Sequence, residues 1–187
     1  MAFLLVPLVI LALLALWLIG VFNGLVRARN EVDASWSGID TELKRRHDLV
    51  PNLVETVKGY AAHERGTLEA VIQARNAAAA PHASTAALAK DEAALAAGLR
   101  QIFALSERYP DLKANASFQQ LQAALADTED RIQRARTVFN GRVRDLNTRI
   151  QVFPGNMVAG SFGFSPREYF ELEGTAERQA PQVSFKS

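Results

Sequence analysis

The sequence predicts an all-α protein in which an N-terminal transmembrane helix continues into an antiparallel, up-and-down bundle of long helices. Three observations favour this fold class: an apolar N-terminal segment, apolar residues spaced by three and four through the rest of the chain, and a composition rich in Leu and Ala with only 8% aromatic residues. Such spacings place side chains on one face of a helix. We expect three long helices and a short C-terminal helix.

Composition narrows the function before any motif is considered. The chain has 187 residues, with 21 Lys and Arg against 20 Asp and Glu, and this balance argues against nucleic acid as a partner. It has no Cys and three His, which removes thiol chemistry and most metal sites. We therefore expect a non-enzymatic protein with no catalytic residues, no cofactor, no bound metal and no small-molecule substrate.

Residues 2–22 contain no charged side chain and form the predicted membrane anchor. As a helix they extend about 31 Å, which matches the ~30 Å hydrocarbon core of a bilayer. Trp17 lies near one end, as an interfacial anchor does, and Phe22 is the last apolar residue. A cleaved signal peptide is the competing interpretation, but no Lys or Arg precedes the apolar run, the run is too long, and no good cleavage site follows it.

The charges beside this segment predict its orientation. Arg27 and Arg29 follow it directly, whereas the N-terminal flank carries only the α-amino group. Positive charge stays on the cytoplasmic side, so we expect the N-terminus outside and the bulk of the chain inside a bacterial cytoplasmic (inner) membrane. The predicted partner of this region is the lipid bilayer, and the predicted anchor residues are Trp17, Phe22, Arg27 and Arg29.

After the anchor, an apolar seam with a period of about 3.5 residues predicts a long first helix from 23 to 76, the pattern of a coiled coil. Its apolar members share one register: Val32, Trp36, Ile39, Leu43, Val50, Leu53, Val57, Tyr60 and Val71. Pro51 interrupts the seam and leaves two interpretations. Either one long helix bends at Pro51, which the unbroken register favours, or Asp48 caps a new helix with Pro51 in its first turn.

Two further long helices are expected, at 85–108 and at 116–152. A loop with Pro81 precedes the first of them, Asn115 or Ser117 caps the second, and each ends before a proline, at position 110 or 154. The Ser-Pro-Arg-Glu sequence at 165–168 is a capping box with proline at the first helical position. It predicts the short C-terminal helix.

The segments around that helix carry the remaining interpretations. A glycine-rich turn at 159–164 holds Phe162 and Phe164, which either plug one end of the bundle, the interpretation we favour, or form a partner-binding loop. From Gly174 the chain is a flexible tail or, alternatively, a strand that adds to a partner's sheet. The predicted domains are therefore an anchor at 1–22, a helical bundle at 23–173 and a tail at 174–187.

The predicted helix lengths do not match one another. The first helix would be roughly 80 Å long, the second about 36 Å and the third about 55 Å, so one chain cannot cover the whole first helix. We expect Val32, Trp36, Ile39 and Leu43 to be partly exposed, and we call these four residues the stripe. An exposed heptad stripe most naturally meets another helix, so the stripe predicts self-association into a homo-oligomer.

The search for catalytic or metal-binding motifs finds none that is complete. His63 and Glu64 resemble the start of a zinc-protease HExxH motif, but Thr67 stands where the second His ligand belongs. The basic cluster Lys44-Arg45-Arg46 is interpreted as a solvated helix face, paired with acidic neighbours at helical spacings.

Several long motifs resemble the LemA family of bacterial membrane proteins. They are VRARNEVDASW at 26–36, LKRRHDLVPNLVETVKGY at 43–60, YPDLKAN at 109–115, TEDRI at 128–132, Phe139-Asn140, and the stretch from Phe153-Pro154 to Tyr169-Phe170. The resemblance implies a single N-terminal span with a short outer N-terminus and a cytoplasmic antiparallel helical bundle. It implies no catalytic residues, and it links the chain to proteins that build or organise membrane compartments.

Two functions of different classes follow. The first is a scaffold or organiser at the cytoplasmic membrane, which self-associates through its long helices. The second is a monomeric, membrane-tethered adaptor that presents its bundle end or its tail to another membrane protein, such as a protease or a sensor. We favour the scaffold here because a long heptad stripe supports it.

Overall fold

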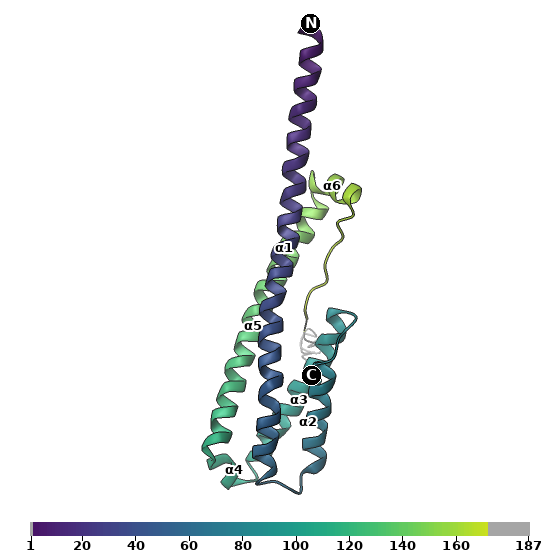
Figure 1. Cartoon of the computed structure of the whole chain (residues 1–187). Helices are drawn as coiled ribbons and strands as arrows, with labels where there is room; N and C mark the ends of the chain where they lie inside the picture. Colours follow the sequence, from purple (N-terminus) through teal and green to yellow (C-terminus); the bar gives the residue numbers. More distant parts are fainter. Residues whose placement is uncertain (1, 172–187) are drawn as a thin grey trace, which may run out of the picture. The chain divides into compact units, whose positions relative to one another are not determined.

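The computed structural model describes residues 2–171, with side chains from residue 5 onward, and six helices make up most of this range (Figure 1). They are α1 (Ala2–Lys58), α2 (Arg65–Ala78), α3 (Thr85–Ser106), α4 (Pro110–Ala114), α5 (Ala116–Gln151) and α6 (Gly155–Phe162). Residues 2–171 contain no β-strand. The all-α prediction, with an N-terminal apolar helix that continues into a helical bundle, is confirmed.

Helix α1 runs through Pro51 without a break. Of the two interpretations of Pro51, the continuous helix is confirmed and the restart at Asp48 is wrong. The helix ends at Lys58, however, and does not continue to residue 76 as predicted. Gly59 follows, and the amides of Tyr60 and Ala61 both bond to the carbonyl of Val57. The chain then turns before α2 begins at Arg65, because a glycine just past a helix is a common stop signal.

The chain divides into two compact units. Among the described residues, the first consists of residues 2–45 and 127–169, and the second of residues 46–126 and 170–171. Helices α1 and α5 contribute to both units. The predicted domain boundaries at residues 22 and 173 stay predictions, and the predicted tail from Gly174 lies outside the described residues.

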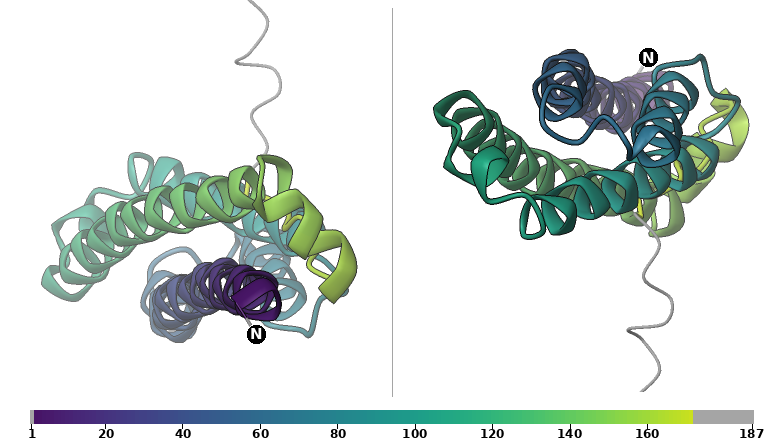
Figure 2. Two further views of the ribbon diagram at one scale, coloured as in Figure 1. Left: turned by 90° about the horizontal axis from the view of Figure 1, so that it is seen from above. Right: turned by 90° about the horizontal axis from the view of Figure 1, so that it is seen from below.

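In the first unit α5 runs antiparallel to α1 (Figure 1), and α6 follows at the end of α5 (Figure 2). Successive residues along α1 meet earlier and earlier residues of α5. The Arg149 guanidinium donates to the Gly24 carbonyl at 3.4 Å, and the next contacts join Arg142 to Glu31 at 3.2 Å and Phe139 to Trp36 at 5.1 Å between ring centroids. The α5 residues on this face are spaced by three, four or seven and are buried: Thr128, Ile132, Phe139, Val143, Leu146 and Ile150.

Three of the four stripe residues are buried inside a single copy of the chain, so the prediction of partial exposure is wrong for Val32, Ile39 and Leu43. Val32, Ile39 and Leu43 are only 2%, 0% and 3% exposed, and half-buried Trp36 packs edge-on against Phe139. The reason lies in the lengths. Residues 65–78 form α2 and do not extend the first helix, while the 36-residue α5 is about 54 Å long and runs along α1 opposite the stripe.

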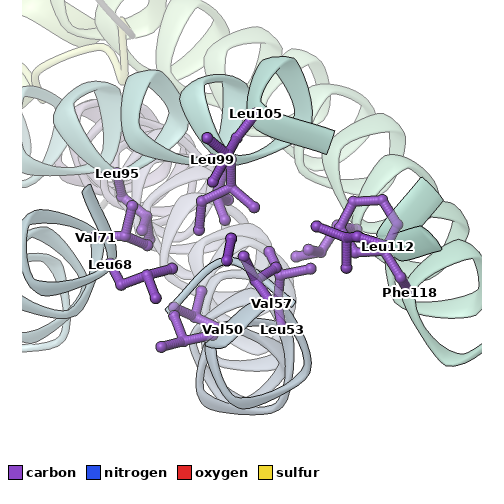
Figure 3. Close-up of a cluster of buried hydrophobic side chains, with 14 of the residues drawn as sticks. Val50, Leu53, Val57, Leu68, Val71, Leu95, Leu99, Leu105, Leu112 and Phe118 are labelled. Atoms are coloured by element: carbon purple, nitrogen blue, oxygen red, sulfur yellow. The ribbon is translucent and has the colours of Figure 1, made fainter. Parts of the chain in front are cut away.

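The second unit has its own apolar core (Figure 3). Helix α1 supplies Val50, Leu53 and Val57, which continue the predicted register on both sides of Pro51. Of the residues labelled in Figure 3, the other helices supply Leu68, Val71, Leu95, Leu99, Leu105, Leu112 and Phe118. The Ser84 hydroxyl accepts from the Ala87 amide at 3.2 Å, and Asn115 accepts from the Phe118 amide at 2.9 Å. These caps confirm the predicted starts of α3 and α5, whereas the short α4 was not predicted.

The C-terminal helix lies earlier in the chain than predicted. Helix α6 covers Gly155–Phe162 and ends at Gly163, whose φ of +72° suits a left-handed C-cap, so the predicted glycine-rich turn is mostly helical. Residues 164–171 are not helical, and the capping box at 165–168 does not start a helix. Asn147 explains this, because its side chain accepts from the Arg167 amide at 2.8 Å and donates to the Arg167 carbonyl at 2.9 Å.

Candidate functional site

Five aromatic residues gather where the apolar part of α1 meets α6, and we call them the aromatic cluster. Trp17 lies 6.3 Å from Phe153 between ring centroids. Phe22 contacts two further rings edge-on, Phe162 at 5.0 Å and Phe164 at 5.7 Å. Edge-to-face packing at these separations is favourable for aromatic pairs. The cluster therefore ties α6 to the end of the apolar segment.

Two local features turn the chain back from α5 to α1 at this place. Gly155 starts α6 so close to α5 that a Cβ atom on it would lie 1.9 Å from the carbonyl oxygen of Arg149, a position that only glycine allows. The paired hydrogen bonds between Asn147 and Arg167 then fasten the returning chain to α5. Residues 148–166 therefore form a loop that is closed at its base and carries three of the five rings.

The charged side chains within the two segments that meet at the aromatic cluster are all arginines. Arg27 and Arg29 follow the apolar segment, and Arg149 and Arg167 flank the loop, whereas residues 1–30 and 146–167 contain no Asp or Glu. The Arg29 guanidinium lies 5.3 Å from the ring centre of Phe164, at cation–π distance. Arg167 also bonds Asp33 at 2.8 Å. This end of the first unit is thus locally cationic in a chain whose overall charge is balanced.

The part of α1 beyond the aromatic cluster has no packing partner among the described residues. Side chains 5–20 are all exposed, and this is the one helix of the described chain that is long and apolar enough to cross a membrane by length and composition. Continuous exposure over such a length is the behaviour of a membrane span rather than of a buried core helix.

The structure brings together most of the residues predicted for the anchor and for the loop. Trp17, Phe22 and Arg29 lie with Phe162 and Phe164 in one cluster, while Arg27 is exposed beside them. The stripe is not part of this site. The sequence analysis missed Phe153 and Asn147. An exposed aromatic directly before Pro154 was the available signal for the former, and nothing local marked the latter.

A second group of functional side chains is a buried ion cluster in the second unit. Arg46 and His47 of α1 both bind the Glu92 carboxylate of α3, His47 through Nε2 at 2.7 Å. Arg46 and Glu92 are fully buried and His47 nearly so. Arg75 of α2 donates to the His47 carbonyl at 3.2 Å. The interpretation of Lys44-Arg45-Arg46 as a solvated face is therefore wrong for Arg46, although Lys44 and Arg45 are exposed.

Glu64, His82 and Asp91 make structural contacts. Glu64 accepts from Arg108 at 3.1 Å and from the Tyr109 hydroxyl at 3.3 Å, and His82 pairs with Asp91 at 2.9 Å. Within residues 2–171 no three His, Asp or Glu side chains form a group that could hold a metal ion. A pocket between α2 and α3 is lined by Thr67, Gln101, Ala104, Leu105 and Arg108, a set without an acid–base pair.

One surface carboxyl has a displaced pKa. Arg131 donates from Nε to Asp127 at 2.8 Å, and this hydrogen bond lowers the pKa of the Asp127 carboxyl below its usual value. Desolvation opposes the shift, and the positive charges of Arg131, Arg45 and Arg134 add to it. The arrangement is an i, i+4 pair on an exposed helix face and indicates no chemistry.

A helical bundle joined to an exposed apolar helix of membrane-spanning length, with aromatic rings and arginines at the junction, indicates the class of membrane-associated helical-bundle proteins. The sequence model of the LemA family matches residues 35–185, and the chain belongs to this family.

Three relatives illustrate the family's range. The magnetosome protein MamQ of Magnetospirillum gryphiswaldense is 24% identical over 174 residues, 80% of this chain and 64% of its own. The LemA protein of Metamycoplasma hominis is 28% identical over 144 residues, 75% of this chain and 64% of its own. The magnetosome protein MamQ 2 of Paramagnetospirillum magneticum is 30% identical over 73 residues, 39% of this chain and 27% of its own. The chain spans a little under two thirds of the first two.

Proposed function

We propose that this protein is a non-enzymatic, membrane-tethered adaptor of the bacterial cytoplasmic membrane. Its N-terminus lies outside, α1 crosses the bilayer once, and the helical bundle is held at the cytoplasmic surface for another membrane protein to bind. The observation that carries the proposal is α1 itself. A span-length apolar segment that is fully exposed runs without a break into a helix whose seam is packed against α5.

The burial of most of the stripe supports the adaptor over the scaffold. A scaffold that assembles through Val32, Ile39 and Leu43 would need these side chains free, but α5 runs along them and they are buried in the chain. Prising α5 away would expose its own apolar face to water, at a cost that grows with the area exposed. Self-association stays a prediction without this surface to support it, and the adaptor becomes the better supported function.

The proposal of a non-enzymatic role rests on the chemistry of the described side chains. The buried Glu92 and His47 are adjacent but closed off from solvent, so no substrate reaches them. The relatives, the LemA protein and the magnetosome protein MamQ, do not have enzyme names. A binding role at a membrane accounts for these features without an active site.

Site-specific photocrosslinking in native membranes tests the adaptor. Tyr60 lies in the turn after α1, is partly exposed and is aromatic, so p-benzoylphenylalanine replaces it with little change of shape. We expect an adduct between the chain and one other membrane protein of defined mass. Val138, exposed on α5, is the control position. Adducts of the chain with itself alone, or no adduct at all, would contradict the adaptor.

A further inference from the structure

We propose that α6 and the turn before it are a second membrane contact, inserted into the lipid interface beside the span. The proposed occupant of this surface is the bilayer itself. The inference rests on the proposed function to the extent that α1 must cross the membrane. It adds that the chain returns to the lipid after leaving it.

The first step is the exposure of apolar side chains in this loop. Phe153, Met157 and Phe162 are 71%, 64% and 55% exposed, and Val152 is half exposed beside them. On the other face of α6, Val158 and Ala159 are buried together with Gly155. An apolar patch of this kind on a water-soluble surface is unfavourable and indicates an interaction site.

The second step is the position of the patch along α1. Along the helix, Trp17 lies about 15 Å before Arg27, and Phe22 lies about 7.5 Å before Arg27. Because Phe153 contacts Trp17, and Phe162 contacts Phe22, both rings lie level with the last turns of the apolar segment. If residues 2–22 fill a hydrocarbon core of ~30 Å, these rings lie at or below its surface. Interfacial helices reach about 5–10 Å into this boundary.

The third step is the charge pattern. Residues 150–166 contain no Asp, Glu, Lys or Arg, so the loop carries no ionic group into the lipid. Arg149 and Arg167 stand at its two ends, and Arg27 and Arg29 at the end of the span, without an acidic residue in either segment. An apolar tip with cations at its base is the pattern of a peripheral contact with anionic headgroups.

Continuity with the span favours lipid over a protein as the occupant. Side chains 5–20 of α1 are all exposed and need lipid around them, and the patch on α6 touches this surface at Trp17 and Phe22. The Ser161 hydroxyl in the patch donates a hydrogen bond to the Met157 carbonyl at 3.0 Å. This internal hydrogen bond lowers the cost of placing the hydroxyl in lipid. Bilayer that surrounds the span therefore also reaches the patch.

Depth measurement with single cysteines tests the inference in the full-length protein. The chain has no cysteine, so each variant carries one environment-sensitive fluorophore. Phe153→Cys and Met157→Cys report on the patch, Leu13→Cys on the span, and Val138→Cys on exposed α5. Each protein is placed in nanodiscs of phosphatidylethanolamine and phosphatidylglycerol, with and without brominated acyl chains.

We expect brominated lipid to quench the label at 153, 157 and 13, with emission shifted to shorter wavelength, and to leave the label at 138 unchanged. Met157 is mostly exposed, so its label depends little on the packing of the cluster. Quenching at 13 without quenching at 153 and 157 would overturn the inference and leave the span intact. A shift of the label emission at 153 and 157 to shorter wavelength that occurs only after a membrane extract is added would also overturn it. That result would indicate a protein partner. Absence of quenching at 13 would show that α1 does not cross the bilayer, and it would contradict both proposals.

Discussion

Glu92 holds two basic side chains in the interior of the second unit, and its charge is needed there. Burial of ions is costly unless they are paired, so loss of one partner leaves an uncompensated charge. We expect Glu92→Gln to lower the free energy of unfolding by about 3–5 kcal/mol, because Arg46 stays buried without its carboxylate. Denaturant unfolding of the full-length protein in detergent, followed by circular dichroism, measures this loss.

Two variants control the Glu92 measurement. Glu107→Gln removes the same charge from an exposed pair with Lys113 and should cost no more than about 1 kcal/mol. The double variant Arg46→Leu with Glu92→Leu removes both ions, and it should be more stable than Glu92→Gln. Equal losses for Glu92→Gln and Glu107→Gln would show that the cluster does not stabilise the fold.

The Asp127 carboxyl offers a second residue-scale measurement. Its pKa is lowered by the hydrogen bond from Arg131, so the stabilisation from this pair is present at neutral pH and is lost as pH falls through the lowered pKa. In an NMR titration we expect Asp127 to titrate below 3.8, and Arg131→Gln to raise its midpoint. Arg134→Gln, which removes only a weaker charge effect, should move it less. An unchanged midpoint in Arg131→Gln would refute the assignment.

At the scale of elements, the contact between α1 and α5 is the feature that changed the functional conclusion. Ile39 is fully buried within the chain, so Ile39→Asp should destabilise the first unit by at least about 3 kcal/mol instead of only dissolving a complex. Ser37→Asp introduces the same charge on the exposed side of α1 and should be nearly neutral. Thermal unfolding of both variants compares them. A well-folded Ile39→Asp protein would mean that the stripe is not part of the core.

Sequence periodicity predicted the helices well and their ends less well. The spacing of apolar residues predicted α3 and α5 to within two residues and the passage of α1 through Pro51. It did not predict the end at Lys58, because the same register resumes in α2 and hides the turn. The capping box at 165–168 failed because Asn147, which is distant in the sequence, takes both backbone groups of Arg167. Glu92 was missed for the same reason, since its partners lie on another helix.

The candidate site followed a similar division. Trp17, Phe22 and Arg29 could be predicted as an anchor from hydropathy and charge alone. Phe162 and Phe164 could be predicted as a structured loop from their composition. That these two groups meet depends on the close approach of Gly155 to α5 and on the Asn147 bonds, which no local pattern indicates. The sequence pattern therefore predicted the anchor and the loop separately, but it did not predict that they are in contact.

At the scale of the whole molecule, the orientation proposed from Arg27 and Arg29 can be measured directly. We expect Ser187→Cys to react with a membrane-impermeant maleimide only after the membrane is opened, because the bundle lies in the cytoplasm. A cysteine carried in a short hydrophilic tag joined to the N-terminus should react in intact spheroplasts. The reverse pattern of labelling would invert the topology and the surface on which a partner binds.

The oligomeric state tests the central claim most directly. The claim is that one chain buries its own apolar seam and is tethered to the membrane as a monomer. The measurement is the native mass of the full-length protein extracted into nanodiscs. We predict that the purified chain has the mass of one 20.5 kDa copy, apart from lipid. A stable homo-oligomer that persists on dilution, and that disappears in Ile39→Asp while the protein stays folded, would contradict the account.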